Sequence, residues 1–437
     1  MAFRLAFVFS RSLLIKLFKG LKHFWDLARR AGGVPAVPPP PPDGGLRAWM
    51  QCLAGFGIFF NTWGLLNSFG VFQAFYERDF LSSSNSSQIS WIGTVQSSFI
   101  MLGSVYSGPL YNWGYLKALI LIGSFLLVFG MFMTSLCDKY WQTLLDQGLL
   151  MGLGTGCLFT PTTGVVASYF AKRRGLAMGI VSTGSTIGGI IYPVMFHKLA
   201  QTVGFGWATR AIAFIMLALT ALPITAMEMR LKPPTIRRVF DISAWKEPHY
   251  YTFYAMALFV GYMGMYIPFF YIQVYCLENS IMTEDLGFYL LPIMNASGFF
   301  GRLALGHLAD RIGPLNAFIL SSGACGVLVF GWIGIESEAT IMMFCLLYGF
   351  FSSGLITLPA TVVTVNLCPD IRQYGVRLTM QLVPSAIGLL IGNPIAGAIL
   401  KDGWLGLQVF AAATIIGCTA LSIASRVAKA VELLDAM

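Results

Sequence analysis

Arg302 is the side chain in this sequence whose surroundings most directly suggest chemistry. It stands alone well inside an apolar run. An ionised group is costly to hold in such a run, so residues of this kind mark candidate functional sites. Because a guanidinium binds carboxylates and other anions, Arg302 is a candidate for binding an anionic ligand. Pairing with helix-end carbonyl groups, or extension of the side chain toward the membrane surface, is the structural alternative.

Neutral polar side chains in other apolar runs supply further candidates. Buried amides and phenols need hydrogen-bond partners, which are either a bound substrate or a neighbouring helix. Pro268 lies among the tyrosines, where it frees a backbone carbonyl group and favours a bend. A pocket of aromatic rings and amides suits a flat or amphipathic organic molecule. The candidates are Asn61, Asn67, Tyr262, Tyr266, Asn295 and Gln381.

Several kinds of chemistry are not indicated. The sequence has no HExxH pattern, no paired acids and no Walker loop, and its eight cysteines show no CxxC spacing. The net charge of +9 comes from basic residues in short loops between apolar runs. We therefore expect no enzyme activity, no metal, no cofactor and no nucleic-acid partner. Coupling to protons stays open, and the expected partners are a small-molecule substrate and the lipid bilayer.

The elements that would position these residues are membrane-spanning helices. Of the 437 residues, 56% are hydrophobic and 11% are charged, with a mean hydropathy of +0.71, whereas soluble domains carry about 25% charged residues. A spanning helix needs roughly 20 apolar residues. We predict an all-α membrane protein with twelve transmembrane helices, at residues 48–76, 89–111, 116–136, 142–168, 174–196, 208–229, 249–275, 286–306, 314–335, 339–366, 376–399 and 404–427.

Basic residues predict the orientation of these helices. Of the 28 Lys and Arg residues, twenty-two fall on the side that holds both termini and the middle loop, and four fall on the opposite side. Since cytoplasmic loops are enriched in Lys and Arg, we expect both termini in the cytoplasm. The cell membrane is the expected location, and the vacuolar or another internal membrane is the alternative. Lys172, Arg173 and Arg174 would anchor this topology, and Asn85 forms a glycosylation sequon on the outer side. We expect a monomer.

An internal repeat divides the chain. A nearly constant offset between short motifs predicts two parallel six-helix repeats with a binding site between them. The predicted units are a tail (1–42), an N-terminal half (43–229), a cytoplasmic linker (230–248) and a C-terminal half (249–437). The apolar, basic and proline-rich tail fits an amphipathic surface helix, a transit-like peptide or a wrongly chosen start codon. The repeated motifs are Gly156-x-Leu158-x-x-Pro161 with Gly354-x-Ile356-x-x-Pro359, and Ser185-x-Ile187-Gly188 with Ser385-x-Ile387-Gly388.

A loop motif in the second half resembles a signature of the major facilitator superfamily. The motif is Gly306-His-Leu-Ala-Asp310-Arg311-Ile-Gly313, and Gly108-Pro-Leu-Tyr-Asn112-Trp-Gly114 is a degraded copy in the first half. The resemblance implies the major facilitator fold, with Asp310 at the start of a neighbouring helix, paired to a basic residue and bracing the outward-open state. Arg377 is the expected partner. Since Asn112 cannot form an ion pair, we expect the two halves to be latched unequally.

Two further motifs resemble the monocarboxylate-porter family within that superfamily. They are Asp43-Gly44-Gly45-x-x-Ala48-Trp49 and Tyr169-Phe170-x-Lys172-Arg173-Arg174-x-Leu176-Ala177-x-Gly179, and the Gly-Trp-Ala-Thr-Arg210 run is typical of fungal members. Their expected roles are structural, with Asp43 capping the first helix. The resemblance also implies that Arg302 faces the cavity and meets a substrate carboxylate. The acid and the lysine that usually accompany this arginine are replaced by Gly298 and Asn67.

These observations favour a secondary active transporter of a small organic molecule that works by alternating access. The substrate would be a carboxylate or a secondary metabolite. Export is favoured over uptake, because the cavity residues are mostly neutral and aromatic. The Gly184-Ser185-Thr186-Ile187-Gly188-Gly189 run also resembles an antiporter motif of drug exporters, with Ser185 in place of proline. The alternatives are an uptake permease for a monocarboxylate or vitamin-like nutrient and a non-transporting membrane receptor.

Overall fold

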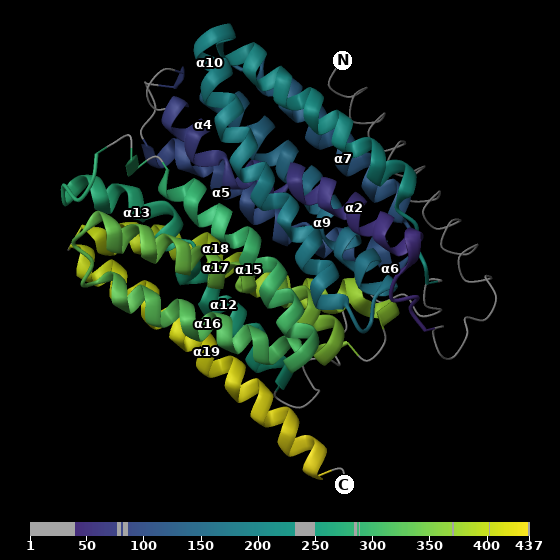
Figure 1. Cartoon of the computed structure of the whole chain (residues 1–437). Helices are drawn as coiled ribbons and strands as arrows, with labels where there is room; N and C mark the ends of the chain where they lie inside the picture. Colours follow the sequence, from purple (N-terminus) through teal and green to yellow (C-terminus); the bar gives the residue numbers. More distant parts are fainter. Residues whose placement is uncertain are drawn as a thin grey trace, which may run out of the picture.

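The protein is described by a computed structural model that covers residues 40–76, 80–81, 86–231, 250–283, 286–287, 289–368, 371–401 and 403–435. Figure 1 shows a bundle in which an early, purple-to-teal group of helices lies beside a late, green-to-yellow group. Most of the predicted tail, most of the predicted linker and the sequon residue Asn85 lie outside the described residues.

Helices make up nearly the whole described chain. The early group consists of α2 (Gly45–Asn61), α3 (Trp63–Asn67), α4 (Phe69–Phe75), α5 (Ser86–Leu102), α6 (Ser104–Asn112), α7 (Leu116–Thr134), α8 (Tyr140–Thr143), the π-helical segment η2 (Leu144–Leu150), α9 (Met151–Tyr169) and α10 (Arg174–Ala226). The late group consists of α12 (Tyr250–Met265), α13 (Ile267–Glu278), α15 (Leu290–Ile312), α16 (Pro314–Trp332), α17 (Glu338–Val362), η3 (Val363–Leu367), η4 (Ile371–Gln373), α18 (Tyr374–Leu400) and α19 (Trp404–Asp435).

The described residues contain the predicted twelve membrane crossings. Eight helical stretches are long and apolar enough to cross a membrane. One of these, α10, has 53 residues and forms two crossings, because Gly204 with a φ of 80° interrupts it. The remaining crossings are α2–α4, α5–α6 and α15, which are broken or carry charged residues. The main difference from prediction is at α19, which continues to Asp435 instead of ending at 427.

Large apolar side chains are exposed on the outer helices of the bundle. On α7 they form a continuous surface, and 63% of Phe125 is exposed. Soluble proteins rarely leave such a continuous apolar helix face open to water, whereas an apolar solvent stabilises it. The face therefore contacts lipid. It consists of Leu121, Ile122, Phe125 and Phe129.

Two crossing helices are broken near the middle of the bundle. The first crossing is interrupted at Thr62 and again at Ser68, which separate α2, α3 and α4. The seventh is interrupted at Tyr266, and Pro268 lies in the first turn of α13. The interruption therefore lies directly beside this proline. Asn67, at the end of α3, and Tyr266, at the second interruption, both line the space between the two groups of helices.

Two helix crossings join the early and late groups. α10 packs against α15, and α5 with α6 packs against α18. The backbones touch at both crossings: a methyl group added at Gly175 would overlap the carbonyl oxygen of Gly306, and one added at Gly375 would overlap that of Gly108. Such close approach requires glycine. Both contacts lie at one end of the bundle, which also holds loops 113–115 and 170–173. We call it the basic end and the opposite end, with residues 135–139, the far end.

Asp310 closes the first of these crossings. Its carboxylate accepts hydrogen bonds from the backbone N–H groups of Gly175 (2.6 Å) and Leu176 (2.9 Å), at the start of α10. The N-terminus of a helix offers unpaired N–H groups and a partial positive charge, so it binds a carboxylate well. The guanidinium of Arg377 lies over the ring of Tyr251 at 5.5 Å, and its pairing with Asp310 stays a prediction. The helix start supplies positive charge, and the basic side chains of Arg174 and His307 lie close enough to act on the same carboxylate.

Asn112 closes the second crossing with fewer bonds. Its Oδ1 accepts one hydrogen bond, from the backbone N–H of Gly375 at the start of α18 (3.0 Å). The carboxylate at the first crossing accepts two. The second crossing also has a hydrogen bond from Thr379 Oγ1 to the carbonyl oxygen of Ser104 (2.6 Å), and the unequal latching of the halves stays a prediction. Both motifs then turn through glycines with positive φ, 94° at Gly114 and 92° at Gly313.

Asp43 has a different role from the one predicted. It does not cap α2, whose N-cap residue is Gly44 without a side-chain hydrogen bond. The Asp43 carboxylate accepts hydrogen bonds from the N–H groups of Ala171 (2.5 Å) and Lys172 (2.8 Å). Its φ of 53° turns the chain away from α2, so its side chain reaches the loop between α9 and α10.

The basic run after α9 divides into two kinds of residue. Lys172 and Arg173 are exposed, as a topology anchor would be, and so is Arg311 at the end of α15. Arg174 instead donates through Nε to the carbonyl oxygens of Ala167 (3.1 Å) and Phe170 (2.8 Å) and caps the end of α9.

Replacing Gly306 by alanine should weaken the contact at the basic end. The added methyl group would overlap the carbonyl oxygen of Gly175, and overpacking of this kind costs about 1–3 kcal/mol. The midpoint of thermal unfolding of the purified protein should fall by several degrees. Gly331→Ala is the control, because nothing lies within 4 Å of the added group. Equal midpoints for the two variants would contradict the contact.

Candidate functional site

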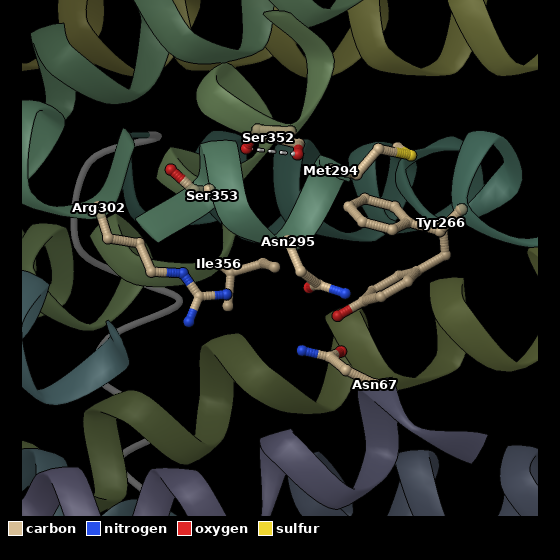
Figure 2. A pocket seen from close by; sticks show the side chains of 11 residues that line it. Asn67, Tyr266, Met294, Asn295, Arg302, Ser352, Ser353 and Ile356 are labelled. Atoms are coloured by element: carbon tan, nitrogen blue, oxygen red, sulfur yellow. Dashed lines mark hydrogen bonds between the residues drawn. The ribbon is translucent and has the colours of Figure 1, made fainter. Parts of the chain in front are cut away.

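A cavity lies between the two groups of helices. In this state the cavity is small, with a volume of about 10 Å³, roughly the room for one water molecule. Figure 2 shows polar side chains from α3, from Tyr266 between α12 and α13, and from α15 and α17 around it. The lining residues are Asn67, Tyr266, Phe269, Met294, Asn295, Gly298, Arg302, Gly349, Ser352, Ser353 and Ile356. Because α3 belongs to the early group and the others to the late group, the cavity depends on how the two groups are packed.

Arg302 contributes the only charge among these lining residues. The side chain is 3% exposed, and its Nη1 donates to the carbonyl oxygen of Ser182 and to Oγ of Ser185, both on α10. Its Nε has no hydrogen-bond partner among the described residues. No carboxylate of the described chain forms an ion pair with it, and Tyr266 is its one electrostatic neighbour. The guanidinium therefore keeps donors for an anion.

Two amides and a phenol converge beside Arg302. Figure 2 shows the Tyr266 hydroxyl and the amides of Asn67 and Asn295 pointing toward one another. A methyl group added at Gly189 would lie 3.5 Å from Nδ2 of Asn67 and 3.7 Å from Nδ2 of Asn295, so both amides end above α10. The buried Tyr266 hydroxyl has no partner within the described part of the chain. Buried polar groups need partners, and a bound polar molecule would supply them.

The rest of the wall is apolar or already hydrogen-bonded. Phe269, Met294 and Ile356 provide apolar surface. The ring of Phe269 lies 5.8 Å from that of Tyr266 and 5.9 Å from that of Tyr348. Ser353 donates to a carbonyl of its own helix, that of Phe350 (2.7 Å). The cavity therefore offers a polar, cationic side and an apolar side, as a site for an amphipathic acid would.

Gly298 stands at the position where the monocarboxylate porters that the sequence resembles usually carry an acidic residue next to the arginine. The residue is one helical turn before Arg302 on α15 and lines the cavity. A Cβ atom there would lie 3.3 Å from the carbonyl oxygen of Gly349 and 3.8 Å from Cβ of Ser353. A small side chain would fit with little movement. The absence of an acid at this position leaves the Arg302 charge available.

Three of the predicted candidates lie outside the cavity lining. Asn61 donates to the carbonyl oxygen of Met216 (3.0 Å) and accepts from Tyr192 (2.7 Å), so it joins helices of the early group. The hydroxyl of Tyr262 donates to the carbonyl oxygen of Leu355 (3.2 Å) and joins α12 to α17. Gln381 donates to the carbonyl oxygen of Tyr251 (3.4 Å). These side chains serve contacts between helices, which was the alternative role.

Sequence reasoning missed part of the cavity and one buried acid. Ser352 and Ser353 gave no signal, because serine is common in membrane helices and its face on the helix cannot be assigned from one sequence. Asp146 lies in η2, is 8% exposed and accepts a hydrogen bond from Thr134 Oγ1 (2.8 Å). It falls within a predicted crossing and could have been found there, but it does not line the cavity.

The sequence matches known transporters over most of its length. Residues 51–389 match the Major Facilitator Superfamily. The chain is 42% identical to the MFS-type transporter dbaD of Emericella nidulans, over 85% of this chain and 84% of that protein. It is 38% identical to the aspyridones efflux protein apdF of the same fungus, over 86% of this chain and 77% of that protein.

A solved structure confirms the arrangement of the helices. The crystal structure of the transporter FucP in the outward conformation superimposes with a TM-score of 0.65 and covers 86% of this chain and 98% of that one. At 15% sequence identity, the likeness concerns the fold. With twelve crossings, a cavity between two groups of helices and this family match together, the chain belongs to the Major Facilitator Superfamily and is an integral membrane protein of the transporter class.

Proposed function

We propose that the protein exports a small organic acid, or a secondary metabolite that carries an acidic group, by alternating access. The substrate would enter at the basic end and leave at the far end. The observation that carries the proposal is the buried Arg302 without a carboxylate partner in the described chain, beside the Tyr266 hydroxyl, which has no partner there, and the amides of Asn67 and Asn295. The efflux name of a relative that is 38% identical supports the outward direction.

Each side chain of the cavity would contact a different part of the substrate. Arg302 would bind the acidic group, the two amides and the Tyr266 hydroxyl would bind neighbouring oxygen or nitrogen atoms, and Phe269 with Met294 would contact the apolar body. This chemistry includes the monocarboxylates suggested by sequence motifs and extends to larger acids. A water-poor site strengthens each of these polar contacts.

Alternating access would follow from the two crossings at the basic end. In the structure Asp310 and Asn112 bind the starts of α10 and α18, so the basic end is closed. Loading would require residues 43–229 and 249–437 to separate there as two bodies joined by the linker 230–248. Following the bias of Lys and Arg, we assign the basic end to the cytoplasm and the protein to the cell membrane, as a monomer.

Deleting the gene should cause one acidic metabolite to accumulate inside the cell. If the protein exports that compound, the ratio of intracellular to extracellular amount should rise several-fold in the deletion strain and return to the parental value when the intact gene is restored. Mass spectrometry of cells and medium measures the ratio. A compound that instead disappears from cells would indicate uptake, and unchanged profiles would contradict export.

Arg302→Ala should reduce transport of that acid in reconstituted vesicles by about 10- to 100-fold, because a hydrogen bond to a charged group contributes about 1.5–3 kcal/mol. Arg302→Lys should retain part of the activity through its charge. Arg210→Ala is the matched control, since Arg210 also lies in a crossing helix but contacts Ser135 and Trp207 away from the cavity. Normal transport by Arg302→Ala would contradict substrate binding by Arg302 and indicate that it serves only contacts between helices.

Gly298→Asp should inhibit transport of the acid about tenfold or more. The new carboxylate would lie one turn from Arg302 and compete with the substrate for the guanidinium. Gly298→Asn has the same size without the charge, so it should change transport little. Initial rates of flux into vesicles compare the two. Equal inhibition by both variants would mean that the effect comes from size and not from competition for Arg302.

A further inference from the structure

One face of α10 binds the Arg302 guanidinium. The carbonyl oxygen of Ser182 and Oγ of Ser185 both accept hydrogen bonds from Nη1. These residues are three apart, so they lie one above the other on the helix. The Ser185 hydroxyl donates its own hydrogen to the Ser182 carbonyl oxygen (2.9 Å), which leaves its oxygen lone pairs for the guanidinium. Two neutral oxygens thus accept hydrogen bonds from Nη1 of Arg302, which has no carboxylate partner in the described chain.

These oxygens reach Arg302 because α10 and α15 cross without space between them. A Cβ atom at Gly179 would contact the carbonyl oxygen of Arg302. Nearby, Oγ of Ser182 lies 3.0 Å from Oγ1 of Thr357 on α17. The same crossing ends at the basic end, where Asp310 binds the start of α10. The contact between Arg302 and α10 therefore belongs to the state in which the basic end is closed.

We infer that the Ser182 carbonyl oxygen and the Ser185 hydroxyl oxygen act as an internal substitute for the acidic group of the substrate. When the basic end closes, α10 brings these oxygens to Arg302 and displaces the acid from one guanidinium nitrogen. Ser185 is therefore a positioning residue for release. This inference rests on the proposed export function and adds the step that lowers affinity on the release side.

The exchange of partners gives the two states different affinities. With the basic end open, α10 is withdrawn and every Arg302 donor is free for the acid. When the basic end is closed, the acid must compete for the guanidinium with two oxygens that α10 already holds in place. A ligand shifts a conformational equilibrium only through such a difference in affinity. A hydrogen bond to a charged group is worth roughly tenfold or more in a binding constant, which suffices for loading on one side and release on the other.

The repeat supplies a matched control. Ser385 on α18 occupies the position equivalent to Ser185, 200 residues later. It is fully buried, and its hydroxyl donates to the carbonyl oxygen of Gln381 (2.9 Å) within its own helix. It does not line the cavity and makes no hydrogen bond to an arginine among the described residues. Removing this hydroxyl tests the effect of losing a buried serine in the same motif without touching Arg302.

The experiment measures the accessibility of Arg302 and its protection by an acid. The full-length protein in lipid vesicles is treated with phenylglyoxal, and modification of Arg302 is followed by mass spectrometry of its peptide, with benzoate as the acidic probe. In Ser185→Ala, Arg302 should react several-fold faster, and benzoate should protect it at roughly tenfold lower concentration. Ser385→Ala and Ser185→Thr, which keeps the hydroxyl, should match the unmodified protein. Turnover of an exported acid by Ser185→Ala should show lower KM together with lower kcat.

Each outcome decides a different point. Faster labelling and tighter protection in Ser185→Ala alone support the inference. Protection of Arg302 by benzoate at the same concentration in unmodified protein and in Ser185→Ala would overturn the inference and leave the proposed function intact. No protection in either protein would overturn both, because Arg302 would then not bind an acid. Equal changes in Ser185→Ala and Ser385→Ala would assign the effect to packing and overturn the inference.

Discussion

The burial of the Arg302 charge is the constraint on which the rest of this structure depends. An arginine at the centre of a spanning helix costs about 2.5–3.5 kcal/mol on insertion scales, and this one is 3% exposed. In the described chain it is held by two neutral oxygens of α10 and by no carboxylate. The interior is thus stable with the charge in place yet still offers donors to an anion. An acid in this cavity would complete a set of contacts that the protein leaves incomplete.

The packing of α10 against α15 determines both the contacts at the basic end and the partners of Arg302 in the cavity. The glycines at positions 175 and 306 let α10 and α15 touch, and Asp310 then binds the free N–H groups at the start of α10. The same approach, continued along both helices, brings Ser182 and Ser185 to Arg302. Because packed helices move as rigid units, separating them at the basic end would also change the partners of Arg302. In the proposed transport cycle, opening of the basic end and a change in the partners of Arg302 would therefore occur together.

Backbone groups do much of the work expected of side chains. Asp310 accepts hydrogen bonds from a helix start, Asp43 from the loop before α10, and Arg302 donates to the carbonyl oxygen of Ser182. In a medium without water, unpaired N–H and C=O groups are costly, so polar side chains are drawn to them. Sequence motifs report which side chain is polar, but they do not report a main-chain partner. This explains why the motif residues were found and their partners were not.

The sequence by itself determined the twelve apolar crossings, the two-fold repeat and the charged residue around which the site is built, because hydrophobic length, repeat offset and isolated charge are local properties. Only the tertiary structure decided which amide side chains lie beside Arg302. Asn61 and Asn67 lie on the same crossing, but Asn61 bonds to helices of the early group, while Asn67, six residues later, lines the cavity. Rotation about a helix axis is set by packing against neighbours, and no local pattern in an almost uniformly apolar helix fixes it.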